Sequence, residues 1–283
     1  MYEDDGVSDP QRAWLDGLGP TVDALCERWS LEVGSPFQPG GRTAWVAPAR
    51  RRDGTDAVLK VAWRHDEALH EADGLQAWRG EGAVHLLDRL DVDAQTTALL
   101  LERCNPGTPL SQRPEPEQDE VIAGLLPRLW VEPLAGHPFR SLQEMCDRWA
   151  DGYERKSVDE RRSVDRGVAR EGIALLRALA TSADRYVLLC TDLHAGNVLA
   201  ADREPWLVID PKPYVGDPSY DAVQHLLNCP DRLRADPLGL VARVAGLLDL
   251  DPERLRLWLF ARCVQESPTW PGLAEVAAQV RPG

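Results

Sequence analysis

The chain has 283 residues, a length beyond that at which one hydrophobic core usually stops growing, so two lobes are expected. Its formal net charge of −14 argues against nucleic-acid binding, and no apolar run approaches the ~20 residues of a membrane helix. The acidic start of the sequence has no apolar signal segment, and the six cysteines lack zinc or disulfide spacing. We therefore expect a cytoplasmic monomer whose partner is a small molecule, and the acidic excess permits a cationic one.

The first residues, 1–33, are predicted to form a helical extension. Its helices are expected at Asp9–Leu15 and Pro20–Leu31, the second with proline at a favourable first position. Beyond the extension, Gly40 and Gly41 precede a short β-prone run. Two adjacent glycines are more often a simple turn, and only their place ahead of the next strand suggests a hairpin over phosphates.

One lysine lies inside an apolar, strand-like run, Ala57–Trp63. Of the 32 Lys and Arg residues in the chain only three are lysine, so Lys60 is an unexpected choice at this position. An unpaired buried ammonium would be costly, and a compact ammonium suits phosphates better than a guanidinium fork does. The helical run Glu67–Trp78 supplies its best partner, Glu71, with Glu67 as the alternative one turn earlier.

A second apolar strand, Thr97–Glu102, ends the first lobe, and we place the boundary near Asn105. The two domains are then residues 1–104 and 105–283. The second is predicted to be mainly helical, with helices at Pro116–Trp130, Ser141–Arg155, Asp165–Ala183, Asp217–Asn228, Leu238–Leu250, Pro252–Glu266 and Gly272–Val280.

A predicted hairpin in the second lobe carries the most informative residues. Its strands are Val198–Ala200 and Trp206–Ile209, with turn-forming Asp and Pro between them. Closing the hairpin brings Asn197 beside Asp210, and amide and carboxylate oxygens of this kind hold Mg²⁺. Asp192, on the loop leading in, is then left to face a substrate hydroxyl. The arrangement is that of a phosphoryl-transfer site.

The spacing from Asp192 to Asn197, Asp-x-x-x-x-Asn, is that of the catalytic loop of protein kinases. Residues 192–199, Asp-Leu-His-Ala-Gly-Asn-Val-Leu, resemble the aminoglycoside phosphotransferase and choline kinase branch of the kinase-like fold. Residues 209–221, Ile-Asp-Pro-Lys-Pro-Tyr-Val-Gly-Asp-Pro-Ser-Tyr-Asp, are similar to the streptomycin 6-kinase and hydroxyurea phosphotransferase family. The resemblance extends over most of the chain from the Lys60 strand onward.

The resemblance implies an α+β, two-lobed protein-kinase-like fold. The N-terminal lobe would hold an antiparallel sheet and one main helix, and the C-terminal lobe would be mainly helical. ATP and Mg²⁺ are the implied cofactors. ATP would lie between the lobes, with its adenine against the backbone near Glu102 and Cys104 and its phosphates near Lys60.

The same resemblance suggests roles for residues around the catalytic aspartate. Asp192 would accept the hydroxyl proton, and Lys212 would touch phosphate or anchor its loop. His194 occupies the place of a phosphate-contacting lysine in protein kinases, although a hydrogen-bonded loop histidine is an equally good interpretation. Many relatives carry His where this chain has Cys190, which we interpret as a buried substitute and not a nucleophile.

Candidates for holding a cationic acceptor come from the acidic residues. Glu144, Asp147, Asp151 and Glu154 follow spacings of 3, 4 and 3, which places four acids on one face of the Ser141–Arg155 helix. Such a face is more often solvated surface, yet like charges at this spacing repel, so a binding role stays open. Glu266, near the C-terminus, is a further candidate.

The sequence therefore predicts an ATP-dependent O-phosphotransferase that acts on a hydroxyl of a cationic small molecule. The resemblance makes streptomycin, phosphorylated at its 6-position, the leading acceptor and antibiotic resistance the expected outcome. Hydroxyurea and metabolic small molecules are alternative acceptors. The alternative from another class is a pseudokinase, which binds nucleotide without catalysis. Such a protein would be expected to lack the phosphate-binding lysine, the base or a metal ligand, and this sequence has all four residues: Lys60, Asp192, Asn197 and Asp210.

Overall fold

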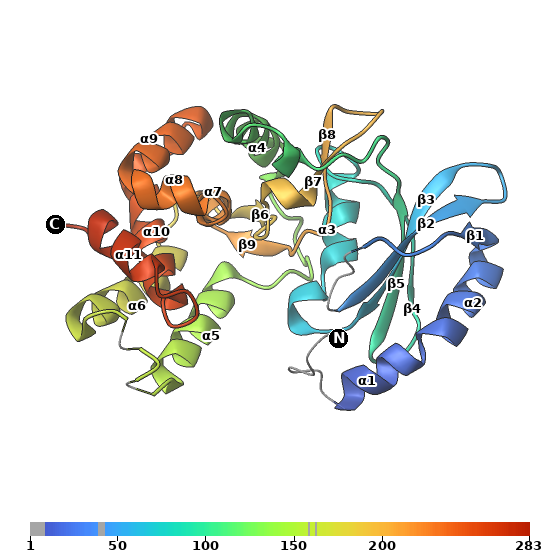
Figure 1. Cartoon of the computed structure of the whole chain (residues 1–283), viewed down its shortest axis with the longest axis horizontal. Coiled ribbons are helices and arrows are strands. Elements are labelled where there is room, and N and C mark those ends of the chain that lie inside the picture. Colours follow the sequence, from blue (N-terminus) through green and yellow to red (C-terminus); the bar gives the residue numbers. More distant parts are fainter. Residues whose placement is uncertain (1–8, 39–42, 158, 162) are drawn as a thin grey trace.

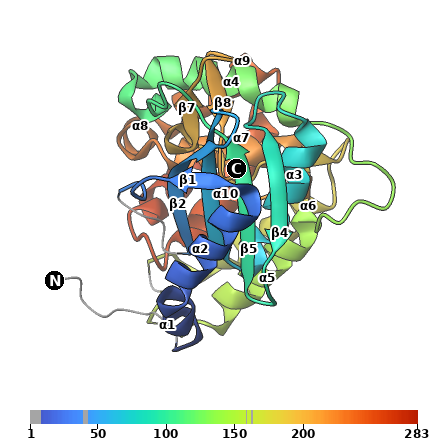
Figure 2. The same ribbon diagram turned by 90° about the vertical axis from the view of Figure 1, so that its right-hand side faces the viewer.

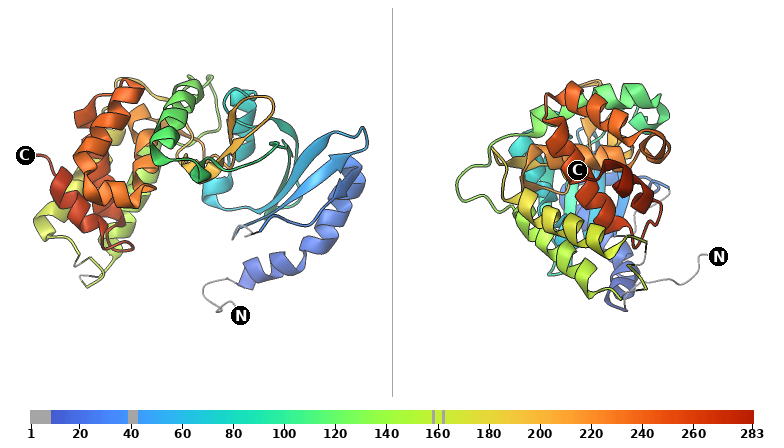
Figure 3. Two further views of the ribbon diagram at one scale, coloured as in Figure 1. Left: turned by 45° about the horizontal axis from the view of Figure 1, so that its top comes forward. Right: turned by 90° about the vertical axis from the view of Figure 1, so that its left-hand side faces the viewer.

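The computed structural model describes residues 9–38, 43–157, 159–161 and 163–283, and these form two lobes (Figure 1). A sheet with three accompanying helices forms the first lobe, and the helical second lobe lies beside it along the longest axis, as Figure 3 also shows. The C-terminus lies at the end of the helical lobe that is farthest from the sheet. Among the described residues, no helix combines the length and apolar character that crossing a bilayer demands.

The sheet of the first lobe has five strands in the order β1-β2-β3-β5-β4, and every neighbouring pair is antiparallel. Its elements in chain order are α1 (Asp9–Asp16), α2 (Leu18–Trp29), β1 (Leu31–Val33), β2 (Ala44–Arg51), β3 (Asp56–Trp63), the 3₁₀ turn η1 (Asp66–Ala68), α3 (Glu71–Trp78), β4 (Leu86–Asp91) and β5 (Thr96–Glu102).

Successive side chains along each strand point to opposite faces of the sheet, and each face is covered by different helices. Leu59 and Val61 of β3 join a core with Leu25 of α2, so α1 and α2 cover one face. Leu99 of β5 joins the other core, together with Leu75 of α3. Figure 1 shows α2 and α3 on opposite sides of the strands, and in Figure 2 α2 lies in front of them. A residue between Leu59 and Val61 must therefore point towards α3, and that residue is Lys60.

The second lobe is mainly helical and also contains two short, two-stranded antiparallel sheets. It comprises η2 (Leu110–Gln112), α4 (Glu115–Leu129), α5 (Leu142–Arg155), α6 (Arg166–Ala180), β6 (Val187–Leu189), η3 (Ala195–Asn197), β7 (Val198–Ala200), β8 (Trp206–Val208), β9 (Tyr214–Gly216), α7 (Pro218–Leu227), α8 (Pro230–Ala235), α9 (Pro237–Leu248), α10 (Pro252–Glu266) and α11 (Leu273–Val280). Fully buried Trp258 and Phe260 make α10 the centre of its core.

Several predicted helix ends are confirmed by the capping contacts that form them. Ser141 precedes α5 and accepts a hydrogen bond from the Glu144 backbone N–H, while the Glu144 carboxylate accepts one from the Ser141 N–H. Asp217 caps α7 by accepting from the Ser219 N–H at 2.9 Å. These side chains satisfy N–H groups that have no partner within their helices.

Two expectations about the first lobe are wrong. The helix predicted over Pro20–Leu31 ends at Trp29, because Ser30 adopts a left-handed conformation (φ 52°) that terminates it. Leu31 then starts β1, which pairs with β2 at the sheet edge. The helix predicted over Glu67–Trp78 begins only at Glu71. Glu67 belongs to the separate turn η1, so it is not on the same helix as Glu71.

Candidate active site

A cleft of about 810 Å³ separates the two lobes. Its walls are formed by β2 and β3, by the segment 101–107 that joins the lobes, and by residues 197–212 of the hairpin region. Lys60, Glu71, Asn197, Asp210 and Lys212 all line it. Five residues nominated from the sequence thus meet in one hollow, although they come from both lobes.

Lys60 is held by two carboxylates. Its Nζ lies 2.7 Å from a Glu71 carboxylate oxygen and 2.5 Å from Asp210 Oδ1, and only 9% of its side chain is exposed. Burial alone would lower the pKa of the Lys60 ammonium, but the charges of Glu71 and Asp210 outweigh it and the pKa is raised. Lys60 therefore stays a cation at the point where α3, β3 and the second lobe meet.

The hairpin β7–β8 brings Asn197 and Asp210 together as predicted. The Ile209 N–H donates to the Asn197 carbonyl at 2.9 Å, which fixes the two ends of the hairpin side by side. Asn197 Nδ2 donates to the Asp192 carbonyl at 3.0 Å, so the remaining polar atom of this side chain is its oxygen. An amide oxygen beside a carboxylate is the hard donor set that suits Mg²⁺. The residues present therefore fit this metal.

Electrostatics favour the ionised form of Asp210. Burial opposes its charge, but Lys60 lowers the pKa of the Asp210 carboxyl below its ordinary value. Asp210 also has a φ of 52°, in the left-handed region that non-glycine residues rarely adopt. Strained backbone of this kind is concentrated at functional sites, where the surrounding structure holds it in place.

Both carboxylate oxygens of Asp192 have partners. Lys212 Nζ lies 2.8 Å from Oδ2, and Gln224 Nε2 donates to Oδ1 at 3.1 Å. Gln224 belongs to α7 and was not nominated from the sequence. It lies three residues after Asp221 and so on the same face of α7, but this spacing alone does not indicate a contact with Asp192.

Asp221 holds the backbone of the catalytic loop. This buried carboxylate accepts hydrogen bonds from the Cys190 N–H (2.9 Å), the Thr191 N–H (2.6 Å) and Trp130 Nε1 (3.1 Å). Thr191 needs this support because its φ is 53°. Burial nevertheless outweighs these donors and raises the pKa of Asp221 to about 6. Asp221 therefore braces this loop from α7.

Cys190 is fully buried, and burial raises the pKa of its thiol well above its ordinary value. A protonated, inaccessible thiol is a poor nucleophile, as predicted. His194 Nδ1 accepts a hydrogen bond from the Gly196 N–H at 3.1 Å, so this ring nitrogen supports its own loop. Gly40 and Gly41 lie outside the described residues.

Glu102 and Cys104 line the cleft where the lobes join. The Glu102 N–H donates to the His85 carbonyl at 2.9 Å, and its carboxylate is bound by the Arg203 guanidinium at 2.8 Å. The Glu102 side chain thereby fixes the segment that joins the lobes to the turn between β7 and β8. Burial raises the pKa of the Cys104 thiol to about 11, so it contributes an uncharged wall.

The acids nominated for a cationic acceptor are not among the residues that line the cleft. Asp147 and Asp151 lie 3.6 Å and 2.6 Å from Arg177 of α6, and Glu154 lies 2.9 Å from the same guanidinium. Glu144 takes part in the cap of α5. Glu266 is 3.1 Å from buried Arg262. Each nominated acid therefore already has a partner within the chain.

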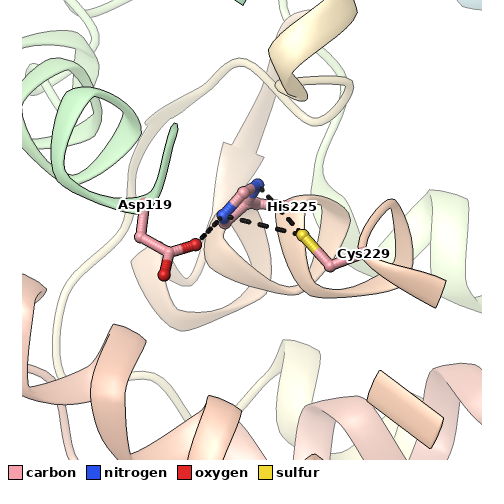
Figure 4. A group of neighbouring side chains, drawn as sticks. All are labelled: Asp119, His225 and Cys229. Carbon is pink, nitrogen blue, oxygen red and sulfur yellow. Dashed lines mark hydrogen bonds and ion pairs between the residues drawn. The ribbon is translucent and has the colours of Figure 1, made fainter. Parts of the chain in front are cut away.

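A separate group of potential metal ligands lies where α4 meets the end of α7, and consists of Asp119 of α4, His225 of α7 and Cys229 just after α7 (Figure 4). His225 Nε2 is 2.7 Å from Asp119 Oδ1, and Cys229 Sγ is 3.9 Å from His225 Nδ1. The Asp119 carboxylate also binds Arg232 and Arg243, at 2.7 Å each. Two guanidinium cations would repel a metal ion, so we interpret the group as a buried ion-pair network that anchors α7.

The comparisons with known proteins agree with this geometry. A family model for the aminoglycoside/hydroxyurea antibiotic resistance kinases matches residues 28–272. The hydroxyurea phosphotransferase of Kitasatospora aureofaciens is 39% identical over 259 residues, which cover 90% of this chain and 73% of that protein. The streptomycin 6-kinase of Streptomyces griseus is 37% identical over 267 residues, covering 90% of this chain and 84% of that protein.

Solved structures extend the likeness to the fold. A thermostable mutant of aminoglycoside phosphotransferase APH(4)-Ia, with ADP and hygromycin B, superimposes with a TM-score of 0.60 at 16% identity. The superposition covers 92% of this chain and 98% of that one. The predicted two-lobed, kinase-like α+β fold is thus confirmed. Together these matches show that the chain belongs to the aminoglycoside/hydroxyurea antibiotic resistance kinases, a family of phosphotransferases.

Proposed function

We propose that this chain transfers the γ-phosphoryl group of ATP to a hydroxyl of a small antibiotic, with streptomycin at its 6-position as the leading acceptor. The observation that carries the proposal is one cleft between two lobes. The cleft is lined by Lys60, which forms ion pairs with two carboxylates, and by Asn197 and Asp210, whose oxygens suit Mg²⁺. Asn197 is hydrogen-bonded to the backbone of Asp192.

Each group has a separate task in this proposal. Lys60, held by Glu71, binds the α- and β-phosphates, and adenine lies against the segment from Glu102 to Cys104. Mg²⁺, held by Asn197 and Asp210, would neutralise charge on the phosphates. Asp192 orients the acceptor hydroxyl and takes its proton during transfer.

Two relatives support different acceptors. The K. aureofaciens protein is named for hydroxyurea and the S. griseus protein for streptomycin, at 39% and 37% identity. Streptomycin leads because the acidic excess of this chain, −14, suits a cationic acceptor. Glu144, Asp147, Asp151 and Glu266 are our candidates for its recognition. Hydroxyurea is the second candidate.

We also propose that the protein acts as a cytoplasmic monomer, with residues 1–104 as the nucleotide lobe and 105–283 as the catalytic and acceptor lobe. A pseudokinase would be expected to lack the lysine, the base or a metal ligand. All of these positions are filled, and Lys60 forms the ion pair that an active kinase requires.

The test is Mg²⁺-dependent release of ADP from ATP with streptomycin, other aminoglycosides, hydroxyurea and choline as separate acceptors. Asp192→Asn is assayed in parallel and should lower kcat at least ~10³-fold, since it removes the proton acceptor. Its nucleotide affinity and melting temperature serve as controls and should match those of the wild type. Nucleotide binding without stimulation by any acceptor would contradict the proposal.

A further inference from the structure

Lys212 lines the cleft and is paired with the aspartate that we propose faces the acceptor. Its Nζ lies 2.8 Å from Asp192 Oδ2, and it lines the same cleft as Asp210, two residues earlier in the chain. The lysine therefore contacts the acceptor-side carboxylate and shares the cleft with the metal-side one. A phosphoryl group that moves from ATP to an acceptor on Asp192 has to pass between these two.

The backbone around Lys212 is fixed on the catalytic loop. Its N–H donates to the Cys190 carbonyl at 2.9 Å, and its carbonyl accepts from Thr191 Oγ1. The side chain is 31% exposed and lines the cleft, so a ligand in the cleft can contact it. A fixed backbone restricts the lysine to short movements of its side chain within the cleft.

The choice of residue type supports a phosphate role. Only three of the 32 Lys and Arg residues are lysines, and two of them, Lys60 and Lys212, line this cleft. A lysine presents a compact charge on a flexible stem, which can change partners within a small space. His194, the nearer candidate by sequence position, already uses Nδ1 in a bond with the Gly196 N–H.

Gln224 would keep Asp192 in place when Lys212 changes partner. Its Nε2 donates to Asp192 Oδ1 at 3.1 Å, whereas Lys212 Nζ lies 2.8 Å from Oδ2 of the same carboxylate. Its neighbour His225 is fixed to buried Asp119 at 2.7 Å, so this part of α7 is anchored from behind. A neutral amide can hold the carboxylate without adding a second charge to the site.

We propose that Lys212 is a catalytic residue that leaves Asp192 to bind the transferring phosphoryl group, and that Gln224 is a positioning residue for Asp192. The proposal rests on the proposed kinase function. In the step, the bond from the γ-phosphorus to the β–γ bridging oxygen breaks, and its electron pair stays on ADP. A bond forms from the acceptor oxygen to the γ-phosphorus, and the hydroxyl proton passes to Asp192. Lys212 keeps its proton and offsets the charge on the phosphoryl oxygens.

The first test needs no acceptor. Affinities for ADP and for a non-hydrolysable ATP analogue are measured with Mg²⁺ for wild type, Lys212→Met and Lys212→Arg. Lys156→Met is the matched control, because this third lysine lies outside the cleft. Lys212→Met should bind the analogue about ten- to a hundredfold more weakly, as expected for loss of one charge-assisted hydrogen bond, and ADP within twofold.

Equal weakening of both nucleotides, or no change in either, would overturn the role of Lys212. Lys212→Arg keeps the positive charge but replaces the compact ammonium with a planar guanidinium. It should therefore recover only part of the affinity for the ATP analogue that Lys212→Met loses. These titrations can fail while acceptor-stimulated turnover persists. Conversely, they can succeed when no acceptor in the panel is phosphorylated, so the two proposals are tested separately.

Gln224→Leu tests the positioning role with Lys212 intact. We expect kcat to fall about tenfold, while the affinities for both nucleotides and the acceptor KM stay within twofold. Gln224→Glu places a like charge beside Asp192 and should lower kcat further. Gln76→Leu, on exposed α3 surface, is the control. A lower melting temperature with unchanged kcat would show a merely structural role and overturn the assignment.

Discussion

Two cavities of similar volume in this protein differ in how their charged groups are held. Beside the cleft between the lobes, about 810 Å³, α7 contacts Asp192 through Gln224, and the carboxylates Asp119, Asp217 and Asp221 around this helix are buried. A second cavity, about 860 Å³, lies along α5 and α6 and is lined by charged side chains that include exposed Glu154 and partly exposed Arg177. Cavity volume therefore does not distinguish the active site from other surface.

The difference lies in what each ion pair holds in place. Around α7, Asp221 binds the backbone of the catalytic loop, and Asp217 binds Arg254 and Trp258 Nε1 at 2.6 Å each. Along α5, Arg177 joins side chains that are each about half exposed. Buried, hydrogen-bonded charges fix geometry and are costly to break, whereas exposed pairs contribute little to stability.

Breaking the buried network behind α7 should have the largest effect on stability. Asp119→Asn leaves two arginines facing a neutral side chain, so we expect the free energy of unfolding to fall by about 3–5 kcal/mol. The measurement is urea unfolding at pH 7. Glu120→Gln is the matched control, because this neighbouring acid is exposed and 3.4 Å from Arg243; it should change stability by less than about 1 kcal/mol. Similar losses in both variants would contradict the comparison.

Acid should remove the same stabilisation. His225, Arg232 and Arg243 hold the pKa of Asp119 well below its ordinary value, although burial opposes them. A depressed folded-state pKa gives stability that is present above the unfolded pKa and is lost as the pH falls towards the folded pKa. The difference between wild type and Asp119→Asn should therefore shrink on going from pH 5 to pH 3.

Asp221 should show the opposite pH dependence, with a smaller effect. Burial raises its pKa from 3.8 to about 6, so its stability contribution is present below pH 4 and is lost as the pH rises through 6. This shift corresponds to roughly 3 kcal/mol. Urea unfolding of wild type and Asp221→Asn between pH 4 and 7 isolates this residue. A pH-independent difference between the two proteins would refute the assignment.

The sequence predicted well which candidate site residues lie together, because their spacing in the chain is short. Asp192 and Asn197 share one loop, and a single hairpin returns Asp210 to Asn197 through the Ile209 N–H. Lys60 was recognisable because a lone lysine in an apolar strand requires a buried acid. Its pairing with Glu71 then follows from strand alternation, which points Lys60 towards α3.

Several strands, and the contact of Gln224 with Asp192, could not be predicted from the local sequence. β4 reads Leu-Leu-Asp-Arg-Leu-Asp, and as an edge strand it lacks the alternation that marks a half-buried strand. β1, β6 and β9 have three residues each, too few to show a period. Gln224 was missed because its partner, Asp192, is 32 residues away in the chain, and only the packing of α7 on the catalytic loop brings them together.

The acidic face of α5 gives the smallest expected effect. Four acids at helical spacing suggested an acceptor site, but Asp147, Asp151 and Glu154 all share Arg177. For Asp151→Asn we expect a stability change below about 1 kcal/mol, because the pair is exposed and two other acids still hold the arginine. The proposed contact between Asp151 and streptomycin predicts that this substitution raises the streptomycin KM about tenfold, whereas a KM within twofold of wild type would show that Arg177 already neutralises this face and would exclude Asp151 from recognition. Steady-state kinetics with streptomycin and hydroxyurea decide between these outcomes, since a rise in KM for streptomycin alone would identify α5 as the surface that recognises its charge.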